Sequence, residues 1–266
     1  TGQAIDFTGG AAVTFESFGG NADTAGSAIS FNTGTVELAA STNLIIESRG
    51  GAVSVKGIMG DTSETVTINA NKTGGAASAT ETITIGTDGI GTGDEIGAVG
   101  LTAADGVTLT GNITLANTDG ANLTVTGPAK IDGTIVIDTG SSGIIDIAPQ
   151  IKGVAGDDNS NVTLDAGGGS IVLDNSAEVI GTDIGTVNLT GATITISDNI
   201  TTDGEAINFI GAAVLNAASQ TITISSGTGA GNIDFSSTID ATQTDGTAEA
   251  LTILSGTGST VIAGDI

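Results

Sequence analysis

Apolar and polar residues alternate over short stretches along the whole chain. Ile5-Asp6-Phe7, Val66-Thr67-Ile68 and Ile222-Thr223-Ile224 are examples in which two apolar side chains flank a polar one. This alternation predicts β-strands, because successive side chains of a strand point to opposite faces. Gly, Asn, Asp and Ser bound these stretches and are typical of turns. Strands of about three residues are too short for independent hairpins, so we expect them to stack in register as a solenoid.

A second period of roughly 90 residues lies above the short strands. The segment 107–173 matches the segment 194–262 strand by strand, so that Val107 and Ile194 hold equivalent places. An earlier copy runs over 29–85, with an offset that drifts before an insertion or deletion. The pattern indicates one continuous repeat segment without a linker or a separate domain.

The repeat copies are expected at approximately 1–89, 90–179 and 180–266 of a single solenoid segment spanning 1–266. The stretch 261–266 restarts the pattern of 179–184. We therefore expect the native molecule to continue into a fourth copy beyond this sequence.

The two periods together predict an all-β fold, a right-handed parallel β-solenoid (β-helix) of about ten coils. About ten strands per long repeat, three to a turn, give three to four coils of roughly 25 to 30 residues. Right-handedness is expected because parallel crossover connections strongly prefer that hand. Each inward-facing Ile, Val, Leu or Phe would contribute roughly 1.5 to 3 kcal/mol on full burial.

The composition favours a narrow, repetitive core and argues against a helical protein. The chain has 43 Gly, 2 Pro and 6 Phe, with no Trp, Tyr, Cys or His. Aliphatic side chains must therefore fill the interior, which suits stacked turns better than one globular core. Without Cys the chain has neither a disulfide framework nor a thiol site.

The charge is strongly acidic and limits the possible partners. Five Lys and Arg residues stand against thirty Asp and Glu residues, which gives a formal net charge of -25. Such a charge repels nucleic acid and anionic lipid, so we expect neither partner. No apolar run approaches the ~20 residues of a membrane-spanning helix, and we expect no membrane insertion.

Some solenoids cleave polysaccharides with paired carboxylates, so acidic groups are the candidates for catalysis. The densest acidic group is Asp157 and Asp158 with nearby Asp165, followed by Asp94 with Glu95. Solvated turns explain both groups as ordinary loop chemistry. The chain lacks His as a general base and Trp or Tyr as a platform for sugar stacking. We therefore predict no enzyme activity, no catalytic residues and no required cofactor.

Calcium is the ion that the acidic surface would attract, because carboxylates and turn carbonyls are its preferred ligands. Asp157, Asp158 and Asp183 are the candidate metal ligands. The GGxGxD repeats of calcium-bound β-rolls are absent, and the nearest fragment, Gly91-Thr92-Gly93-Asp94, occurs once. The sequence therefore allows calcium without requiring it.

Two further patterns have ordinary explanations in a strand repeat. Thr-x-Thr pairs with outward hydroxyls are reminiscent of ice-binding solenoids; they are Thr65/Thr67, Thr82/Thr84, Thr193/Thr195 and Thr221/Thr223. Threonine is a common exposed strand residue, and the spacings of these pairs do not predict one continuous ladder. Asn-x-Thr triplets, which are glycosylation acceptors in eukaryotic secreted proteins, begin at Asn71, Asn112, Asn122, Asn161, Asn188 and Asn199. In a threonine-rich repeat such triplets arise by chance.

The run from Ile194 to Ala241, followed by ALTILSGTGSTVIAGDI at 250–266, resembles repeats of very large bacterial surface proteins related to filamentous haemagglutinin adhesins. The resemblance extends over most of the chain. It implies secretion, attachment to the cell surface and formation of a filament or matrix. It brings no catalytic motif, and the secretion-domain signature of such proteins is absent here.

The sequence thus predicts a structural segment of a long extracellular filament or adhesin stalk, which mediates contact with cells, surfaces or matrix. Its expected partners are other copies of the same protein or further repeats of the same chain, with surface polysaccharide as a further candidate. The alternative is a carbohydrate-binding or carbohydrate-active β-helix of the tailspike kind, which a single groove with clustered carboxylates would favour. An ice-binding solenoid is a third hypothesis.

Overall fold

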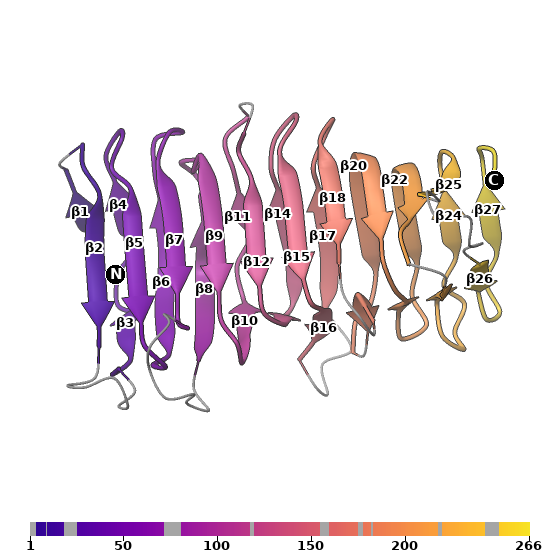
Figure 1. The fold of residues 1–266 in the computed structure, drawn as a ribbon, viewed down its shortest axis with the longest axis horizontal. Helices are drawn as coiled ribbons and strands as arrows, with labels where there is room; N and C mark the ends of the chain where they lie inside the picture. Colours follow the sequence, from indigo (N-terminus) through magenta and orange to yellow (C-terminus); the bar gives the residue numbers. More distant parts are fainter. Residues whose placement is uncertain are drawn as a thin grey trace.

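The computed structural model describes residues 4–8, 10–18, 26–71, 81–117, 120–154, 160–174, 178–181, 183–217, 220–242 and 250–266. Its 27 strands all belong to one hydrogen-bonded sheet, and the strands pair in parallel. Figure 1 shows them side by side along the long axis, with the first strands at one end and the last at the other. The prediction of an all-β parallel β-solenoid is confirmed.

The strands form three ladders, which we name walls 1, 2 and 3. Wall 1 contains β2 (Val13–Ser17), β5 (Leu44–Ser48), β7 (Thr65–Asn69), β9 (Ala98–Thr102), β12 (Leu123–Thr126), β15 (Ile144–Ala148), β18 (Ser170–Leu173), the second halves of β20 (Val187–Ile196) and β22 (Ile207–Leu215), and β25 (Ile239–Ala241).

Wall 2 contains β3 (Ile29–Phe31), the first halves of β6 (Val53–Met59) and β8 (Thr82–Ile90), β10 (Gly106–Leu109), β13 (Ala129–Ile131), β16 (Ile151–Gly153), β19 (Ile180–Gly181), β21 (Ile200–Thr201), β23 (Thr221–Ser225) and β26 (Ala250–Leu254). Wall 3 contains β1 (Ile5–Phe7), β4 (Val36–Leu38), the ends of β6 and β8, β11 (Ile113–Thr114), β14 (Thr134–Asp138), β17 (Asn161–Asp165), the first halves of β20 and β22, β24 (Ile233–Phe235) and β27 (Thr260–Ile262).

One strand segment from each wall makes one turn of the solenoid. The stack contains about eight turns. This is fewer than the number of about ten coils that the sequence predicts. The turns vary in length, because Val13 pairs with Leu44, 31 positions later, whereas Ile194 pairs with Ala213, 19 positions later.

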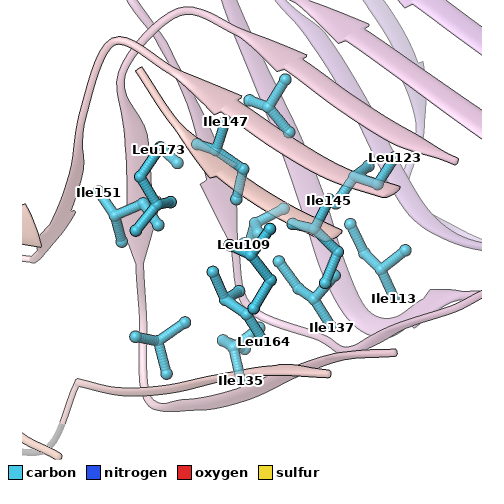
Figure 2. Packing of buried hydrophobic residues seen from close by; sticks show 14 of the residues in the cluster. Leu109, Ile113, Leu123, Ile135, Ile137, Ile145, Ile147, Ile151, Leu164 and Leu173 are labelled. Atoms are coloured by element: carbon cyan, nitrogen blue, oxygen red, sulfur yellow. The ribbon is translucent and has the colours of Figure 1, made fainter. Parts of the chain in front are cut away.

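Inward-facing aliphatic side chains form continuous columns inside the walls. Leu123, Ile145 and Ile171 stack in register on wall 1, and all three side chains are fully buried. Leu109 of wall 2 and Ile137 of wall 3 enter the same interior, as Figure 2 shows. The alternation seen in the sequence therefore separates a core face from a solvent face on each wall.

The phenylalanines extend these columns near both ends of the stack. Phe209 and Phe235 are in register on wall 3, and their rings stack with centroids 4.4 Å apart. At the other end, the ring of Phe15 contacts Phe7 at 5.4 Å and Phe31 at 5.0 Å between centroids. The core thus combines stacked aliphatic residues with a few aromatic rings in offset or edge-on contacts.

No helix among the described residues is long and apolar enough to cross a membrane.

Candidate functional site

A polar hollow on the outer surface lies on wall 3, near the first turns. It has a volume of about 310 Å³, and we call it the acidic groove. Its lining residues come from strands β1, β4 and β6 and from the loops beside them; they are Asp6, Thr8, Glu37, Leu38, Ala39, Met59, Gly60 and Asp94. Three of them are acidic and none is basic.

Strand register brings the two principal carboxylates of the groove together. Asp6 occupies the outward middle position of β1, and Glu37 occupies the same position of β4 directly opposite. Neighbouring strands lie about 4.8 Å apart, so the two side chains share one patch of surface. Asp94 reaches the groove from the loop after β8, where its carbonyl accepts a hydrogen bond of 3.1 Å from the Gly60 N–H.

The local charge favours a proton on Glu37. Desolvation against the wall raises the pKa of Glu37 above its ordinary value. The negative charge of Asp6, a hydrogen bond between the two carboxyl groups and the charge of Asp94 raise this pKa further. The groove therefore favours a proton on Glu37 and disfavours an anionic ligand.

This pair of carboxylates was not singled out by the sequence pattern. Both residues are the polar members of apolar-polar-apolar triplets, Ile5-Asp6-Phe7 and Val36-Glu37-Leu38, and could have been found by that signal. Their pairing, however, depends on the length of the first turn, which the pattern does not determine. Asp94 was noted with Glu95 as a solvated acidic turn and as the end of the fragment Gly91-Thr92-Gly93-Asp94, but not as a neighbour of Asp6 and Glu37.

The predicted calcium ligands are only partly placed by the structure. Asp157 and Asp158 lie outside the described residues. Asp183 follows β19 with a positive φ of 62° and lines a hollow of about 300 Å³ with Thr201, Thr202 and Asp203. Within the described part of the chain, no group of three or more acidic side chains could hold a metal ion. Calcium binding at Asp157, Asp158 and Asp183 stays a prediction.

Other acidic residues are used in turn formation. Asp165 accepts a hydrogen bond of 2.9 Å from the Gly167 N–H, and Asp138 accepts one of 2.8 Å from the Gly140 N–H. The two aspartates are in register on wall 3. Each carboxylate thus caps the turn that follows its own strand, as expected for Asp in a loop.

The Thr-x-Thr pairs are distributed over two walls and do not form one ladder. Thr67 is in register with Gly100, and Thr195 lies between Val172 and Val214 on wall 1. On wall 2, Thr84 is in register with Thr108. The described registers therefore give short threonine patches interrupted by glycine and valine.

Several asparagines of the Asn-x-Thr triplets connect one turn to the next. The side-chain oxygen of each accepts a hydrogen bond from a backbone N–H of the following turn, at distances between 2.6 and 2.9 Å. The pairs are Asn112 with Val136, Asn122 with Ile144, Asn161 with Thr186, and Asn199 with Thr223. These asparagines act as inter-turn braces, a role that the sequence pattern did not indicate.

No protein-family model, no curated protein and no solved structure matches this chain.

Proposed function

We propose that the chain is a structural segment of a long extracellular surface filament or adhesin stalk, which mediates contact between cells or with a surface or matrix. One observation carries the proposal: three uninterrupted ladders and a single continuous core run through the stack from β1 to β27. Each turn is held to its neighbours by parallel strand pairing, which makes a stiff and extensible unit. The mechanism is mechanical and requires no catalytic residue.

The proposal includes a right-handed solenoid and a long sequence repeat of roughly 90 residues. Val107 lies on wall 2, whereas its proposed equivalent Ile194 lies on wall 1. In the same way Leu123 lies on wall 1 and its equivalent Ile207 lies on wall 3. Each long repeat would therefore start one wall away from the preceding copy, which would distribute equivalent outward side chains around the rod.

The proposed setting is the bacterial cell surface, in line with the resemblance of the sequence to filamentous haemagglutinin-type repeats. Its partners would be copies of the same filament protein or further repeats of the same chain. The outward Thr, Asn and Asp side chains of the walls suit hydrated lateral contacts, and the charge of -25 argues against nucleic acid.

Cryo-electron microscopy of the native surface material tests this proposal. We expect fibres with an axial strand repeat of about 4.8 Å and solenoid density that continues along the fibre. A capped, compact particle with one side groove would contradict the filament and favour a carbohydrate-active β-helix.

One observation favours binding of an acidic polysaccharide as a second function. Lys130 and Lys152 stand in register on adjacent strands of wall 2, although the whole chain has only five basic residues. Two lysines on strands about 4.8 Å apart present two ammonium groups on one face, which suits carboxylates along a polymer. A glycan array tests this second function. Binding by the native chain that is lost in the double variant Lys130→Gln/Lys152→Gln and kept in Lys56→Gln would support it. Equal binding by all three proteins would exclude this lysine pair.

A further inference from the structure

One broad stretch of the outer surface carries almost no charge. It is the outward side of wall 1 from β7 to β22, which we call the neutral face. The outward residues of these seven strand segments are Thr, Ser, Asn, Ala, Gly, Val and Ile, with the one exception of Asp146 on β15. Figure 1 shows the strands of wall 1 side by side along the long axis. Such a face is distinctive in a chain with 30 acidic residues.

Charged side chains lie on the other two walls and around the neutral face. Wall 3 presents Asp138 and Asp165 in register, and wall 2 presents Lys130 and Lys152 in register. On wall 1 itself, acidic residues return on the strands just beyond the two ends of the neutral face, β5 and β25. The neutral face thus has a nearly uncharged centre and a charged rim, as protein–protein interfaces do.

Strand register places Asp146 at the middle of the neutral face. Its strand, β15, is the fourth of the seven, and Asp146 is the central outward residue of that strand. Three uncharged residues continue its column on each side; they are Thr124, Gly100 and Thr67, and Val172, Thr195 and Val214. The single charge of the face therefore lies at its centre and not at its rim.

The size and the side chains of the neutral face suit pairing with another sheet. Strands about 4.8 Å apart and about four to five residues long give it an area of about 500 Å², so two facing copies would bury about 1,000 Å². That total reaches the size of a specific interface. No outward strand residue of the face is larger than Ile, and Ile144 is 41% exposed. Short side chains lose less conformational entropy on burial than Lys or Glu.

We propose that the neutral face pairs with the neutral face of a second copy of this chain, in an isologous two-fold contact. The inference rests on the proposed function, because it names the surface through which two filaments meet side by side. Contact through wall 3 would bring the Asp138–Asp165 ladders of two copies together, whereas contact through the neutral face opposes few charges. A cationic partner would be attracted to wall 3 rather than to this face.

Asp146 limits the strength of this contact. A two-fold pairing that covers the whole neutral face brings the two Asp146 carboxylates near each other, because the residue lies at its middle. Like charges in such positions oppose association. Burial raises the pKa of Asp146, and the charge of Asp174 raises it further, so the surroundings already disfavour this charge. The contact should therefore be weak and reversible with Asp146 ionised and tighter without its charge.

Sedimentation equilibrium of the intact chain over a series of protein concentrations measures the pairing. Asp146→Asn keeps the shape of the side chain and removes its charge, and should tighten the dimer by about two- to fivefold. Thr124→Asp adds a carboxylate beside Asp146 and should weaken the dimer by about fivefold or more. Thr223→Asp makes the same replacement at an outward position of β23 on wall 2, and this matched control should associate like the parent chain.

An Asp146→Asn chain that stays monomeric at every concentration would overturn the pairing. So would oligomers that respond equally to the two Thr→Asp replacements or to neither, because another surface would then form them. A monomer with thermal hysteresis that Thr124→Asp abolishes would also overturn it and assign the face to ice. None of these results touches the filament itself, because the axial strand repeat of a fibre does not require a side-by-side contact.

Discussion

Glu64 is a carboxylate with a fully buried side chain at the corner between β6 and β7. It accepts hydrogen bonds from the backbone N–H groups of Ser41 at 2.7 Å and Asp61 at 2.5 Å. The N–H and the hydroxyl of Ser63 also donate to it. Because Ser41 belongs to the preceding turn, one side chain fastens two turns at this corner.

Replacement of Glu64 by Gln should destabilise the solenoid by about 1 to 3 kcal/mol, since an amide cannot accept all of these bonds. Desolvation alone would raise the pKa of Glu64, but the backbone hydrogen bonds from Asp61, Glu64 and Ser41 and the hydroxyl of Ser63 lower it overall. The contribution of Glu64 is thus present above the ordinary value of 4.5 and is lost as the pH falls through the lowered pKa.

Urea unfolding at about pH 7 and about pH 3 tests this assignment. Glu64→Gln should lower the unfolding free energy at the higher pH and show a smaller loss at the lower pH. Glu205→Gln, at an exposed corner, serves as the control and should behave like the parent chain. A Glu64→Gln chain as stable as the control at about pH 7 would contradict the bracing role.

At this scale the sequence indicates the type of position that a residue occupies but not its partner. Ile145 and Leu123 are recognisable as core residues because they flank polar residues in short triplets. Glu64 sits in a polar stretch that reads as an ordinary loop, Asp-Thr-Ser-Glu, and its burial arises from the turn stacked beside it. Such contacts depend on register, which residue type alone does not specify.

At the scale of single elements, the corners limit which residues the chain accepts. Gly211, in the middle of β22, has a φ of +134°, and a Cβ at this position would lie 1.7 Å from the carbonyl oxygen of Gly191 on the neighbouring turn. Gly100, on the outer face of β9, has no atom within 4 Å of its Cβ position. The two glycines therefore make a matched pair for substitution.

Gly211→Ala should destabilise the chain by about 3 kcal/mol or more, because both the backbone conformation and the approach of the neighbouring turn exclude a methyl group. Gly100→Ala should change stability by less than about 1 kcal/mol. Thermal unfolding followed by circular dichroism compares the two directly. Equal melting temperatures for the two variants would show that the corner can relax.

The asparagine braces predict a second effect of the corners. Asn112→Ala removes the acceptor of the Val136 N–H, which lies at 2.9 Å, and should cost about 1 to 2 kcal/mol. Asn32→Ala removes a surface bond to the Ser54 hydroxyl and should cost about 0.5 kcal/mol or less. Chemical denaturation gives both values, and comparable losses would mean that the backbone bond has no special role.

The sequence predicts that a strand is present more directly than it predicts where that strand begins and ends. The triplets at Ile29, Val66 and Ile222 each start or lie in a strand of the structure. In contrast, β20 runs over ten residues and turns from wall 3 to wall 1, with a shift of register between Thr190 and Thr193. A Gly-Ala step in a β-rich stretch does not distinguish such a bent strand from two strands with a turn.

At the scale of the whole molecule, the charge of -25 is distributed over a rod whose turns repeat at one strand spacing. Carboxylates on adjacent turns, such as Asp138 and Asp165, are thereby brought close together. Cations should therefore stabilise the stack through screening, and this general effect must be separated from binding at a specific site.

Calcium distinguishes the two effects. The predicted calcium ligands Asp157, Asp158 and Asp183 offer carboxylate oxygens, which bind Ca²⁺ more tightly than Mg²⁺ because Mg²⁺ loses its water shell reluctantly. We expect about 5 mM CaCl₂ to raise the melting temperature about 1 to 3 °C more than the same concentration of MgCl₂.

Asp183→Asn should abolish this difference, and Asp265→Asn should keep it. Isothermal titration calorimetry with Ca²⁺ should give a saturable heat for the parent chain and none for Asp183→Asn. Equal shifts with both ions, without a saturable heat, would assign the whole effect to screening and make the predicted calcium site wrong.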